Sequence, residues 1–418
     1  MYRTPRGTSD ILPEEQGYWR LVEQAIEQAA ALYGYRRIDT PVFEDTSLFR
    51  RSAGEYTDVV QKEMYTFDDK GGNSLTLKPE GTPAVCRAYI QHGMQNLPQP
   101  VKLYYITPIF RYDRPQAGRY RQHHQFGCEA FGDDDPALDA EVIDMVWYFY
   151  KSLGLDRISL QLNSIGCKKC RPEYINALKE HYAGYTGLCA DCEVRIENNP
   201  MRLLDCKQAS CQTAADSAPM SIDYLCEECG EHFGSLQKYL GLLEIPFTIN
   251  HRMVRGLDYY TRTVFEVQPE EEGSQTTIGG GGRYDDLIEE LGGKPTPAIG
   301  FATGIERIIL NLKEQKTEVP GADNIRVLVI HLGTEAKDAS VKLAARLREA
   351  GVSAVTSTGD KSLKAQMRQA NNLGARYAVI IGDEEISAGT VVLRDMRNAR
   401  QETIFADRLA GHLLERAD

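Results

Sequence analysis

Apolar residues spaced three and four positions apart mark the first predicted element. They recur through residues 21–33, and Gly34 ends the pattern. Pro13 suits the first turn of a helix, where its missing N–H costs nothing, and Asp10 or Ser9 can cap the helix N-terminus. We therefore predict a helix that opens at Pro13 and stops at the glycine.

Alternating apolar and polar positions predict a series of strands, most of them joined by hairpins. Pro41 interrupts the first strand and favours an edge or an interface for it. Many strands with hairpin connections indicate an antiparallel sheet flanked by helices, an α+β fold. The predicted strands cover residues 35–43, 102–110, 125–131, 247–253 and 261–268, and residues 75–82 are predicted to be a strand that runs into a turn. The predicted helices cover residues 83–92, 284–291 and 304–312, and the glycine-dense stretch 279–282 is expected to be a turn.

The pattern changes after a polar segment, residues 313–324, which contains Pro320-Gly321 and is predicted to be a linker. Beyond it, strands alternate with helices, which indicates a small α/β domain with a mainly parallel sheet. We therefore predict two domains, residues 1–322 and 325–418, with a cysteine-rich insertion in the first at about residues 164–235.

Composition narrows the setting in which the 418-residue chain works. It is 42% hydrophobic and 26% charged, with no apolar leader segment and no run of 18 apolar residues, so we expect a cytoplasmic protein with no membrane partner. The net charge of −12 argues against a general nucleic-acid coat. Residues 325–418, however, hold 14 Lys and Arg against 12 Asp and Glu, which weakly favours this part as the place that meets a polyanion.

Eight of the ten cysteines fall within one stretch of about sixty residues. In a reducing compartment such a cluster indicates metal rather than disulfides, and C-x₂-C turns suit tetrahedral Zn²⁺. The alternative is a set of small buried packing residues. Eight thiols allow two closed zinc sites, or one site with spare cysteines, and spacing alone does not pair them. The candidate ligands are Cys167, Cys170, Cys189, Cys192, Cys206, Cys211, Cys226 and Cys229.

The run from Arg255 to Glu266, Arg-Gly-Leu-Asp-Tyr-Tyr-Thr-Arg-Thr-Val-Phe-Glu, crowds a guanidinium, a carboxylate and two phenols into six residues. Such a group can bind a phosphate through the arginine and a small polar ligand through the others. A surface strand with an ion pair is the plainer reading. The run closely resembles the histidine-specific motif of histidyl-tRNA synthetases, which implies that Arg255 lies next to the α-phosphate of ATP.

A second segment carries four arginines within eleven residues between two predicted strands. Phe-Arg followed by Arg-Pro, and closing in Glu-Ala-Phe-Gly, resembles motif 2 of class II aminoacyl-tRNA synthetases. The resemblance implies that Arg111 holds the α-phosphate and the amino-acid carboxylate, with Arg119 also on ATP. It further implies that the loop meets the acceptor end of tRNA through Arg114, Gln116 and Arg121. His123 stands where the family often has a phenylalanine that stacks on adenine, so altered ATP affinity is expected.

Two further stretches complete the resemblance. Gly-x-x-x-Gly-x-Glu-Arg ahead of an amphipathic helix is similar to class II motif 3, which makes Arg307 a clamp on the γ-phosphate, although the glycines by themselves could simply allow close packing. Arg255, Arg111 and Arg307 are thus the expected catalytic residues. By the same resemblance, the histidine-binding residues are Glu80, Thr82, Arg111, Gln125, Glu129, Arg255, Tyr259, Tyr260 and Tyr284.

The resemblance covers nearly the whole chain, and residues 325–418 are similar to the anticodon-binding domain of several class II synthetases. It implies a histidine–tRNA ligase that uses ATP with Mg²⁺, charges tRNA(His), and forms a homodimer through the Pro41 region. The main alternative is the non-catalytic, synthetase-like regulatory subunit of ATP phosphoribosyltransferase, which usually lacks the C-terminal domain. A prolyl or threonyl enzyme is a third candidate, and the Arg255–Glu266 run argues against it.

Overall fold

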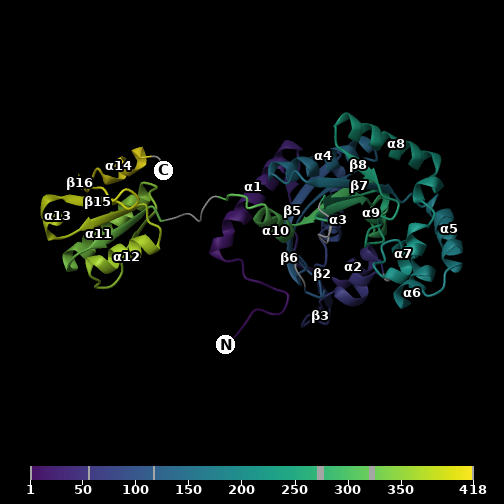
Figure 1. Cartoon of the computed structure of the whole chain (residues 1–418), viewed down its shortest axis with the longest axis horizontal. Coiled ribbons are helices and arrows are strands. Elements are labelled where there is room, and N and C mark those ends of the chain that lie inside the picture. The colour runs from purple at the N-terminus through teal and green to yellow at the C-terminus, as the bar shows by residue number, and fades with distance from the viewer. Residues whose placement is uncertain (1, 55–56, 116–117, 271–276, 320–324, 417–418) are drawn as a thin grey trace. The chain divides into compact units, whose positions relative to one another are not determined.

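The computed structural model describes residues 2–54, 57–115, 118–270, 277–319 and 325–416. The chain divides into two compact units, Met1–Val319 and Pro320–Asp418. Figure 1 shows a large sheet with helices on both sides in the first unit and a smaller sheet with its own helices in the second.

The first unit is built on a sheet with the strand order β1-β5-β6-β11-β10-β9-β7-β8 in its described residues. The β5–β6 hairpin and the β6–β11–β10–β9–β7 run are antiparallel, whereas β1 pairs with β5, and β7 with β8, in parallel. The predicted antiparallel sheet is therefore mixed at both edges. The strands are β1 (Arg36–Arg37), β5 (Val101–Phe110), β6 (Gln122–Phe131), β7 (Ile158–Ser164), β8 (Phe247–Ile249), β9 (Thr261–Pro269), β10 (Gly279–Arg283) and β11 (Ala298–Gly304).

Alternate residues of these strands point into two separate cores, one on each face of the sheet. One face carries α1 (Gln16–Leu32), α4 (Pro136–Ser152), α8 (Glu227–Leu242) and α10 (Ile305–Glu314). The other carries α3 (Thr82–Gln91), α9 (Leu287–Glu290) and the helices of the cysteine-rich insert, α5 (Arg171–Ala183), α6 (Ala190–Asn198) and α7 (Ala209–Asp216). A second sheet, with the order β2 (Phe43–Asp45), β4 (Ser74–Leu77) and β3 (Thr66–Asp68), is accompanied by α2 (Thr46–Ala53).

The glycine-dense stretch predicted to be a turn is instead strand β10, in the middle of the sheet. A Cβ atom at Gly281 would lie 2.0 Å from the carbonyl oxygen of Gly300 on β11, so only glycine allows these strands to come this close. Residues 298–304, which were not predicted to be a strand, form β11, and the predicted helix begins directly after it as α10. Local propensity disfavours glycine in strands, but the close approach of the two backbones requires it here.

Several predicted boundaries were also wrong. The first helix has no side-chain cap from Asp10 or Ser9, because a short 3₁₀ turn, η1 (Pro13–Glu15), precedes α1. Residues 35–43 do not form one strand, since the chain around Pro41 leaves β1 and joins a different sheet as β2. Helix α10 continues to Glu314, into the segment predicted to be a linker.

The second unit has a five-stranded sheet with the order β13-β12-β14-β15-β16 in its described residues. The β13–β12 and β12–β14 pairs are parallel, whereas β14–β15 and β15–β16 are antiparallel, so the prediction of a mainly parallel sheet was only half right. The elements are β12 (Val327–His331), α11 (Thr334–Glu349), β13 (Ala354–Thr356), α12 (Leu363–Asn372), β14 (Tyr377–Ile381), α13 (Asp383–Ala388), β15 (Thr390–Asp395), β16 (Gln401–Phe405) and α14 (Leu409–Glu415). Within the described residues, no helix has the length and apolar character needed to cross a membrane.

The close approach of β10 and β11 predicts a large cost for adding one methyl group. Gly281→Ala forces its Cβ against a backbone oxygen that has nowhere to move, so we expect a loss of about 1–3 kcal/mol in the free energy of unfolding. Gly234→Ala on α8 is the matched control, because nothing lies within 4 Å of its added Cβ. The control should be neutral or slightly stabilising in urea titrations. Equal stability of the two variants would contradict the packing argument.

Candidate active site

A cavity of about 360 Å³ opens over the face of the sheet that carries α3 and α9. Its floor is made of small residues of β10 and β11, and its walls come from β6, the loop between β5 and β6, and the Arg255 segment. The lining includes six of the residues predicted from sequence, namely Arg111, Arg119, His123, Gln125, Arg255 and Arg307. Three parts of the chain that are far apart in sequence therefore meet in one site.

Arg255 reaches the cavity because Gly280, on the strand below it, has no side chain. A Cβ atom at Gly280 would lie 2.7 Å from the Nη1 atom of Arg255. The guanidinium forms an ion pair with Glu266 of β9 and lies over the ring of Tyr260, 5.8 Å from the ring centre to Cζ. Glu266 is itself held by Gln268 Nε2 at 3.0 Å and by the hydroxyl of Thr277. The arginine is thus aimed into the cavity by fixed partners.

Two further arginines enter from other elements. Arg111 follows β5 and donates from Nε to the carbonyl oxygen of Pro79 at 2.7 Å. Arg307 on α10 donates to the carbonyl oxygens of Gly118 and Thr277, at 2.9 and 2.7 Å. Both guanidinium groups therefore keep only part of their donors occupied by backbone. Fixed guanidinium groups with free donors favour a polyanion such as a triphosphate.

The concentration of positive charge shifts the titration of its neighbours. Burial, followed by Arg111 and Arg307, lowers the pKa of His123 to about 3. Burial, Arg119 and Arg111 also lower the pKa of the Arg307 guanidinium. His123 is therefore neutral at physiological pH, and its imidazole offers a flat, uncharged face. Such a face can stack on a base without repelling the arginines.

The remaining predicted residues form a buried pocket beside this cavity. The Glu129 carboxylate is fully buried and accepts hydrogen bonds from Thr82 Oγ1 at 2.7 Å, from Tyr105 Oη at 3.2 Å and from Tyr284 Oη. It fits only because β11 has glycine at position 300, where a Cβ would lie 1.8 Å from Glu129 Oε2. Burial raises the pKa of Glu129 to about 8.

Glu80 completes the wall between the two parts of the site. The hydroxyl of Tyr259 donates to Glu80 Oε2 at 2.9 Å, and burial raises the pKa of this carboxyl to about 7. Among the described residues, Glu80 Oε1, Gln125 Oε1 and Arg255 Nε are buried polar atoms without a hydrogen-bond partner. Two acceptors and one donor left open in a buried site fit a small ligand that has both an ammonium and an anionic group.

The residues predicted to meet tRNA lie on the loop between β5 and β6. Arg114 is exposed, and Arg121 stacks on the ring of Tyr112, with Cζ 3.8 Å from its centre. Gln116 lies outside the described residues. Arg119 forms a 3.4 Å ion pair with Asp113 at the cavity rim. The loop thus presents arginines both to the cavity and to solvent.

Sequence reasoning missed several residues of the site. Tyr105 donates to Glu129 and Glu266 holds Arg255, while Glu63 lines the cavity from η2 (Val59–Glu63). Glu266 closes the motif run already singled out, and a pair on neighbouring strands could have been suspected from it. Nothing in the local pattern marks Tyr105 or Glu63, because their role arises from the packing of distant segments.

Two protein-family models match the chain. A family model described as Histidyl-tRNA synthetase matches residues 7–169 and 203–308, and one described as Anticodon binding domain matches residues 326–416. A histidine–tRNA ligase from Dehalococcoides mccartyi is 60% identical over 410 residues, which cover 98% of each chain. One from Pelotomaculum thermopropionicum is 49% identical over 413 residues, covering 99% of this chain and 97% of that one.

The chain belongs to the histidyl-tRNA synthetase family.

Among solved structures, apo histidyl-tRNA synthetase from S. aureus superposes with a TM-score of 0.84 at 41% identity, covering 99% of this chain and 100% of that chain. The fold class inferred from the motifs, a class II catalytic domain with an anticodon-binding domain, is therefore confirmed. The two stretches matched by the histidyl-tRNA synthetase family model flank residues 170–202, which belong to the cysteine-rich insert.

The raised pKa of Glu129 predicts a pH-dependent stability difference. The folded protein keeps this proton to a higher pH than the unfolded chain, so its contribution to stability is present below about pH 4.5 and is lost as pH rises through about 8. Glutamine at this position does not titrate. Glu129→Gln should therefore gain on the order of 1 kcal/mol or more over wild type between pH 5 and pH 8.5 in urea titrations.

Glu231→Gln, at an exposed position of α8, controls for the loss of one negative charge. If the Glu129→Gln difference stayed constant across this pH range, the carboxyl would not be titrating as its burial requires.

Proposed function

We propose that this chain is a histidine–tRNA ligase. It joins L-histidine to ATP as histidyl-adenylate, releases pyrophosphate, and transfers histidine to the 3′-terminal adenosine of tRNA(His). Full-length relatives at 60% and 49% identity carry the name histidine–tRNA ligase. The observation that carries the proposal is that Arg111, Arg255 and Arg307 line one cavity beside a buried pocket of carboxylates and phenols.

The first step needs positive charge that is already in position. A carboxylate oxygen of histidine attacks the α-phosphorus, the bond to the β-phosphate oxygen breaks, and negative charge grows on the phosphoryl oxygens. Arg255 and Arg111 stabilise that charge at the α-phosphate, and Arg307 holds the γ-phosphate. Because Glu266 and Pro79 already orient two of these groups, little reorganisation is needed.

Histidine recognition uses the buried pocket. The imidazole N–H groups meet the Glu129 carboxylate and Tyr260, while the ammonium meets the open acceptors of Glu80 and Gln125. Thr82, Tyr259 and Tyr284 shape the pocket and hold the two carboxylates. A pocket that hydrogen-bonds its ligand rejects analogues by a factor of about 10⁴ or more, since the wrong ligand leaves buried groups unpaired.

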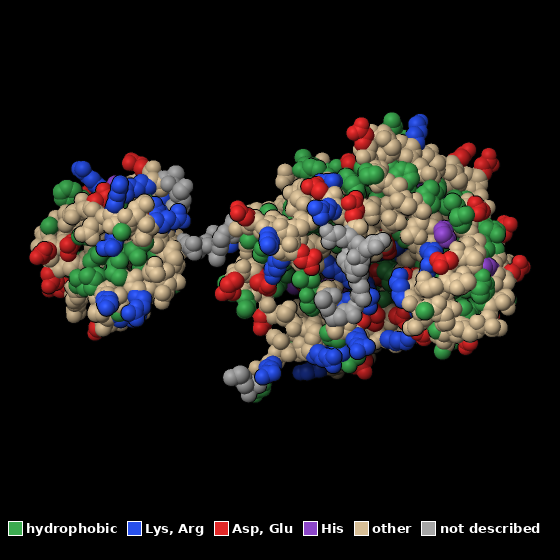
Figure 2. Space-filling model, in the orientation of Figure 1, with side chains coloured by type: hydrophobic (Ala, Val, Ile, Leu, Met, Phe, Trp, Pro, Cys, Tyr) green, Lys and Arg blue, Asp and Glu red, His purple; other side chains and the backbone are tan. Residues whose placement is uncertain are grey.

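The transfer step requires the acceptor end of tRNA to enter the same cavity. Arg114, Gln116 and Arg121 of the β5–β6 loop contact it in this proposal. Figure 2 shows Lys and Arg side chains beside the hollow of the first unit, and others around an apolar patch of the second unit. The second unit, matched by the anticodon-binding model, supplies the contact that selects tRNA(His).

The cofactors of this proposal are Mg²⁺ with ATP and structural Zn²⁺ in the cysteine-rich insert. Carboxylate oxygens suit Mg²⁺. The carboxylates of Glu266, Glu306 and Asp113 are engaged by Arg255, His124 and Arg119. Glu63 is therefore the cavity carboxylate that would hold the ion, which would neutralise phosphate charge. We also propose a cytoplasmic homodimer, in which the exposed rings of Phe43 and Phe67 on the small sheet are covered.

The regulatory subunit of ATP phosphoribosyltransferase is the alternative. A non-catalytic binding protein has no need of three converging arginines, and here all three line one cavity. The 98–99% coverage of this chain by histidine–tRNA ligases also extends through the second unit. Histidine-dependent exchange of labelled pyrophosphate into ATP separates the two functions, because only the ligase forms an adenylate.

Removing Arg255 tests the chemistry. Arg255→Ala should slow histidine-dependent pyrophosphate exchange by roughly a hundredfold or more, because transition-state charge loses a fixed partner. Arg51→Ala, at an exposed position of α2, is the matched control and should leave exchange unchanged. Circular dichroism verifies that both variants fold. Exchange at the wild-type rate in Arg255→Ala would rule out the proposed role.

Removing the second unit separates activation from tRNA selection. A chain ending at Asn324 keeps all of the described active-site residues, so pyrophosphate exchange should remain within about tenfold of wild type. Charging of tRNA(His) should fall by on the order of a hundredfold or more, since a large contact surface is lost. Charging at the full-length rate would show that the second unit serves another purpose.

A further inference from the structure

Four cysteines from the two ends of the insert converge on one point. Cys167 follows β7 and Cys170 directly precedes α5, while Cys226 and Cys229 lie at the start of α8. Their Sγ atoms all lie within 4.8 Å of one another, and Cys167 Sγ is 3.8 Å from both Cys170 Sγ and Cys226 Sγ. Thiolates placed tetrahedrally at about 2.3 Å around one Zn²⁺ stand about 3.8 Å apart.

The other four cysteines form a second, separate group inside the insert. Cys189 and Cys192 belong to the start of α6, and Cys206 and Cys211 flank the start of α7. Their Sγ atoms also lie within 4.8 Å of one another, with Cys189 Sγ 3.8 Å from Cys206 Sγ. All eight are free thiols. The structure thus pairs the cysteines in a way that spacing could not, as two closed sets of four.

Backbone N–H groups point at the sulfurs in both groups. The amide of Cys167 lies 3.2 Å from Cys170 Sγ, and that of Lys169 lies 3.4 Å from Cys167 Sγ. In the second group, the amide of Cys189 lies 3.3 Å from Cys211 Sγ. Donors aimed at sulfur favour thiolates, the form that binds metal, and they orient the ligands from outside the site.

We propose that each group binds one Zn²⁺, and that the two ions hold the insert against the segment 255–262 and so position the histidine pocket. The second part of this proposal rests on the proposed ligase function, whereas the first does not. None of the eight cysteines lines the cavity that Arg111, Arg255 and Arg307 share, so their proposed role is structural. Closed Cys₄ sites leave no open position on the metal for chemistry.

The first group is tied directly to the histidine-specific segment. Arg262 has a left-handed backbone, φ 46°, which costs free energy and must be held by its surroundings. Its amide donates to Gly166 O, and its carbonyl oxygen accepts from Ile165, both at 2.8 Å and immediately before Cys167. Arg171, next to Cys170, donates to Tyr260 O.

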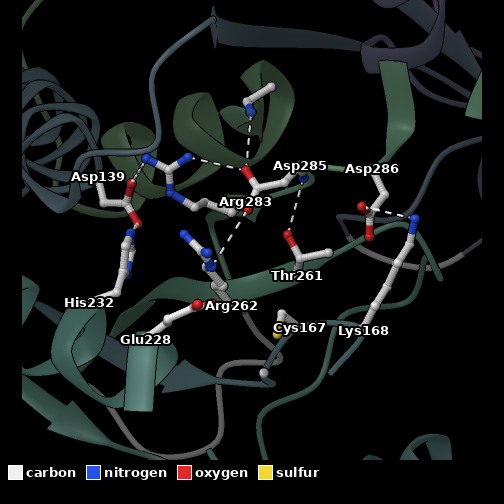
Figure 3. Close-up of polar contacts among 12 residues, drawn as sticks. Asp139, Cys167, Lys168, Glu228, His232, Thr261, Arg262, Arg283, Asp285 and Asp286 are labelled. Atoms are coloured by element: carbon white, nitrogen blue, oxygen red, sulfur yellow. Dashed lines mark hydrogen bonds and ion pairs between the residues drawn. The ribbon is translucent and has the colours of Figure 1, made fainter. Parts of the chain in front are cut away.

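Figure 3 shows polar contacts near Cys167 of this first group. Lys168, between the two cysteines of the first turn, forms a 3.0 Å ion pair with Asp286, and Asp285 accepts from Arg283 and donates from its backbone to Thr261. One helical turn after Cys229, His232 faces the buried Asp139. The start of α8 is therefore linked to the strands that carry the site.

The second group holds the part of the insert that covers the other side of the segment. After α6, Asn199 Nδ2 donates to Asp258 Oδ1 at 2.7 Å, and Arg202 in η4 (Pro200–Leu203) donates to Arg255 O at 3.2 Å. Arg195 on α6 pairs with Asp58, 3.4 Å apart. Loss of this metal would free the start of the helix that positions these side chains, because in such small modules the free energy of metal binding also stabilises the fold.

Elemental analysis of full-length protein, purified without added metal or affinity tag, tests the metal. We expect two zinc ions per chain, one for each group of four thiols. Cys226→Ser/Cys229→Ser and Cys206→Ser/Cys211→Ser should each retain about one zinc, and Cys128→Ser, at a buried cysteine of β6, should retain both. A wild-type content below about 0.2 zinc per chain would overturn the proposal.

A mercurial titration of the wild-type protein covers the case in which a double variant does not fold. Zinc should be released to a chromogenic chelator in step with thiol modification, one ion for every four thiols modified. The eight thiols should react more slowly before the zinc is released than after its release. Eight thiols that react at once in the folded protein, with no zinc released, would equally overturn it.

The positioning role has its own readout. In pyrophosphate exchange, loss of the first zinc should raise the KM for histidine about tenfold or more and leave the KM for ATP within about twofold, because the tie runs to Tyr260 and Arg262 rather than to the ATP side. A folded, zinc-depleted variant with an unchanged KM for histidine would overturn this role alone. Absence of exchange in the wild type would instead count against the ligase function and leave the zinc content to be judged separately.

Discussion

The strands beneath the site, β10 and β11, carry glycines under the charged groups, and those groups occupy the space that larger side chains would fill. Glycine at position 300 leaves room for the Glu129 carboxyl, and glycine at position 280 leaves room for the Arg255 guanidinium. A methyl group at either place would overlap the charged group or push it away. The glycines therefore contribute to the site by having no side chain, while β10 stays paired with β9 and β11 through the backbone.

Burial then decides how the two halves of the site differ. On the carboxylate side, desolvation raises the pKa of Glu80 and Glu129, so both are poised to gain from a ligand that brings a positive charge or N–H donors. On the arginine side, burial and then the neighbouring guanidinium groups lower the pKa of His123 and keep it neutral, and the arginines leave an excess of positive charge that suits phosphates. The two parts of the proposed site thus offer opposite electrostatic surroundings to its two ligands.

The cysteine-rich insert packs against the wall of this site. Its helices share a core with Tyr259, Tyr260 and Tyr284, so whatever stabilises the insert also stabilises the wall of the proposed histidine pocket. A segment this small has little apolar area of its own to bury, and cross-linking by metal is one physical answer to that shortage. Residues 170–202, between the two stretches matched by the family model, supply three of the eight thiols.

The sequence by itself identified the candidate arginines, the order of the motifs and most element types. Helical and strand periodicities are local, and a motif can be recognised from its residues alone. Only the tertiary structure decided that residues 279–282 are a central strand, that Tyr105 supports Glu129, and that Cys167 shares its cluster with Cys226. Each of these depends on contacts between segments far apart in the chain. Steric and electrostatic fit at such contacts overrides local propensity, and this fit cannot be read from a short stretch of neighbouring residues.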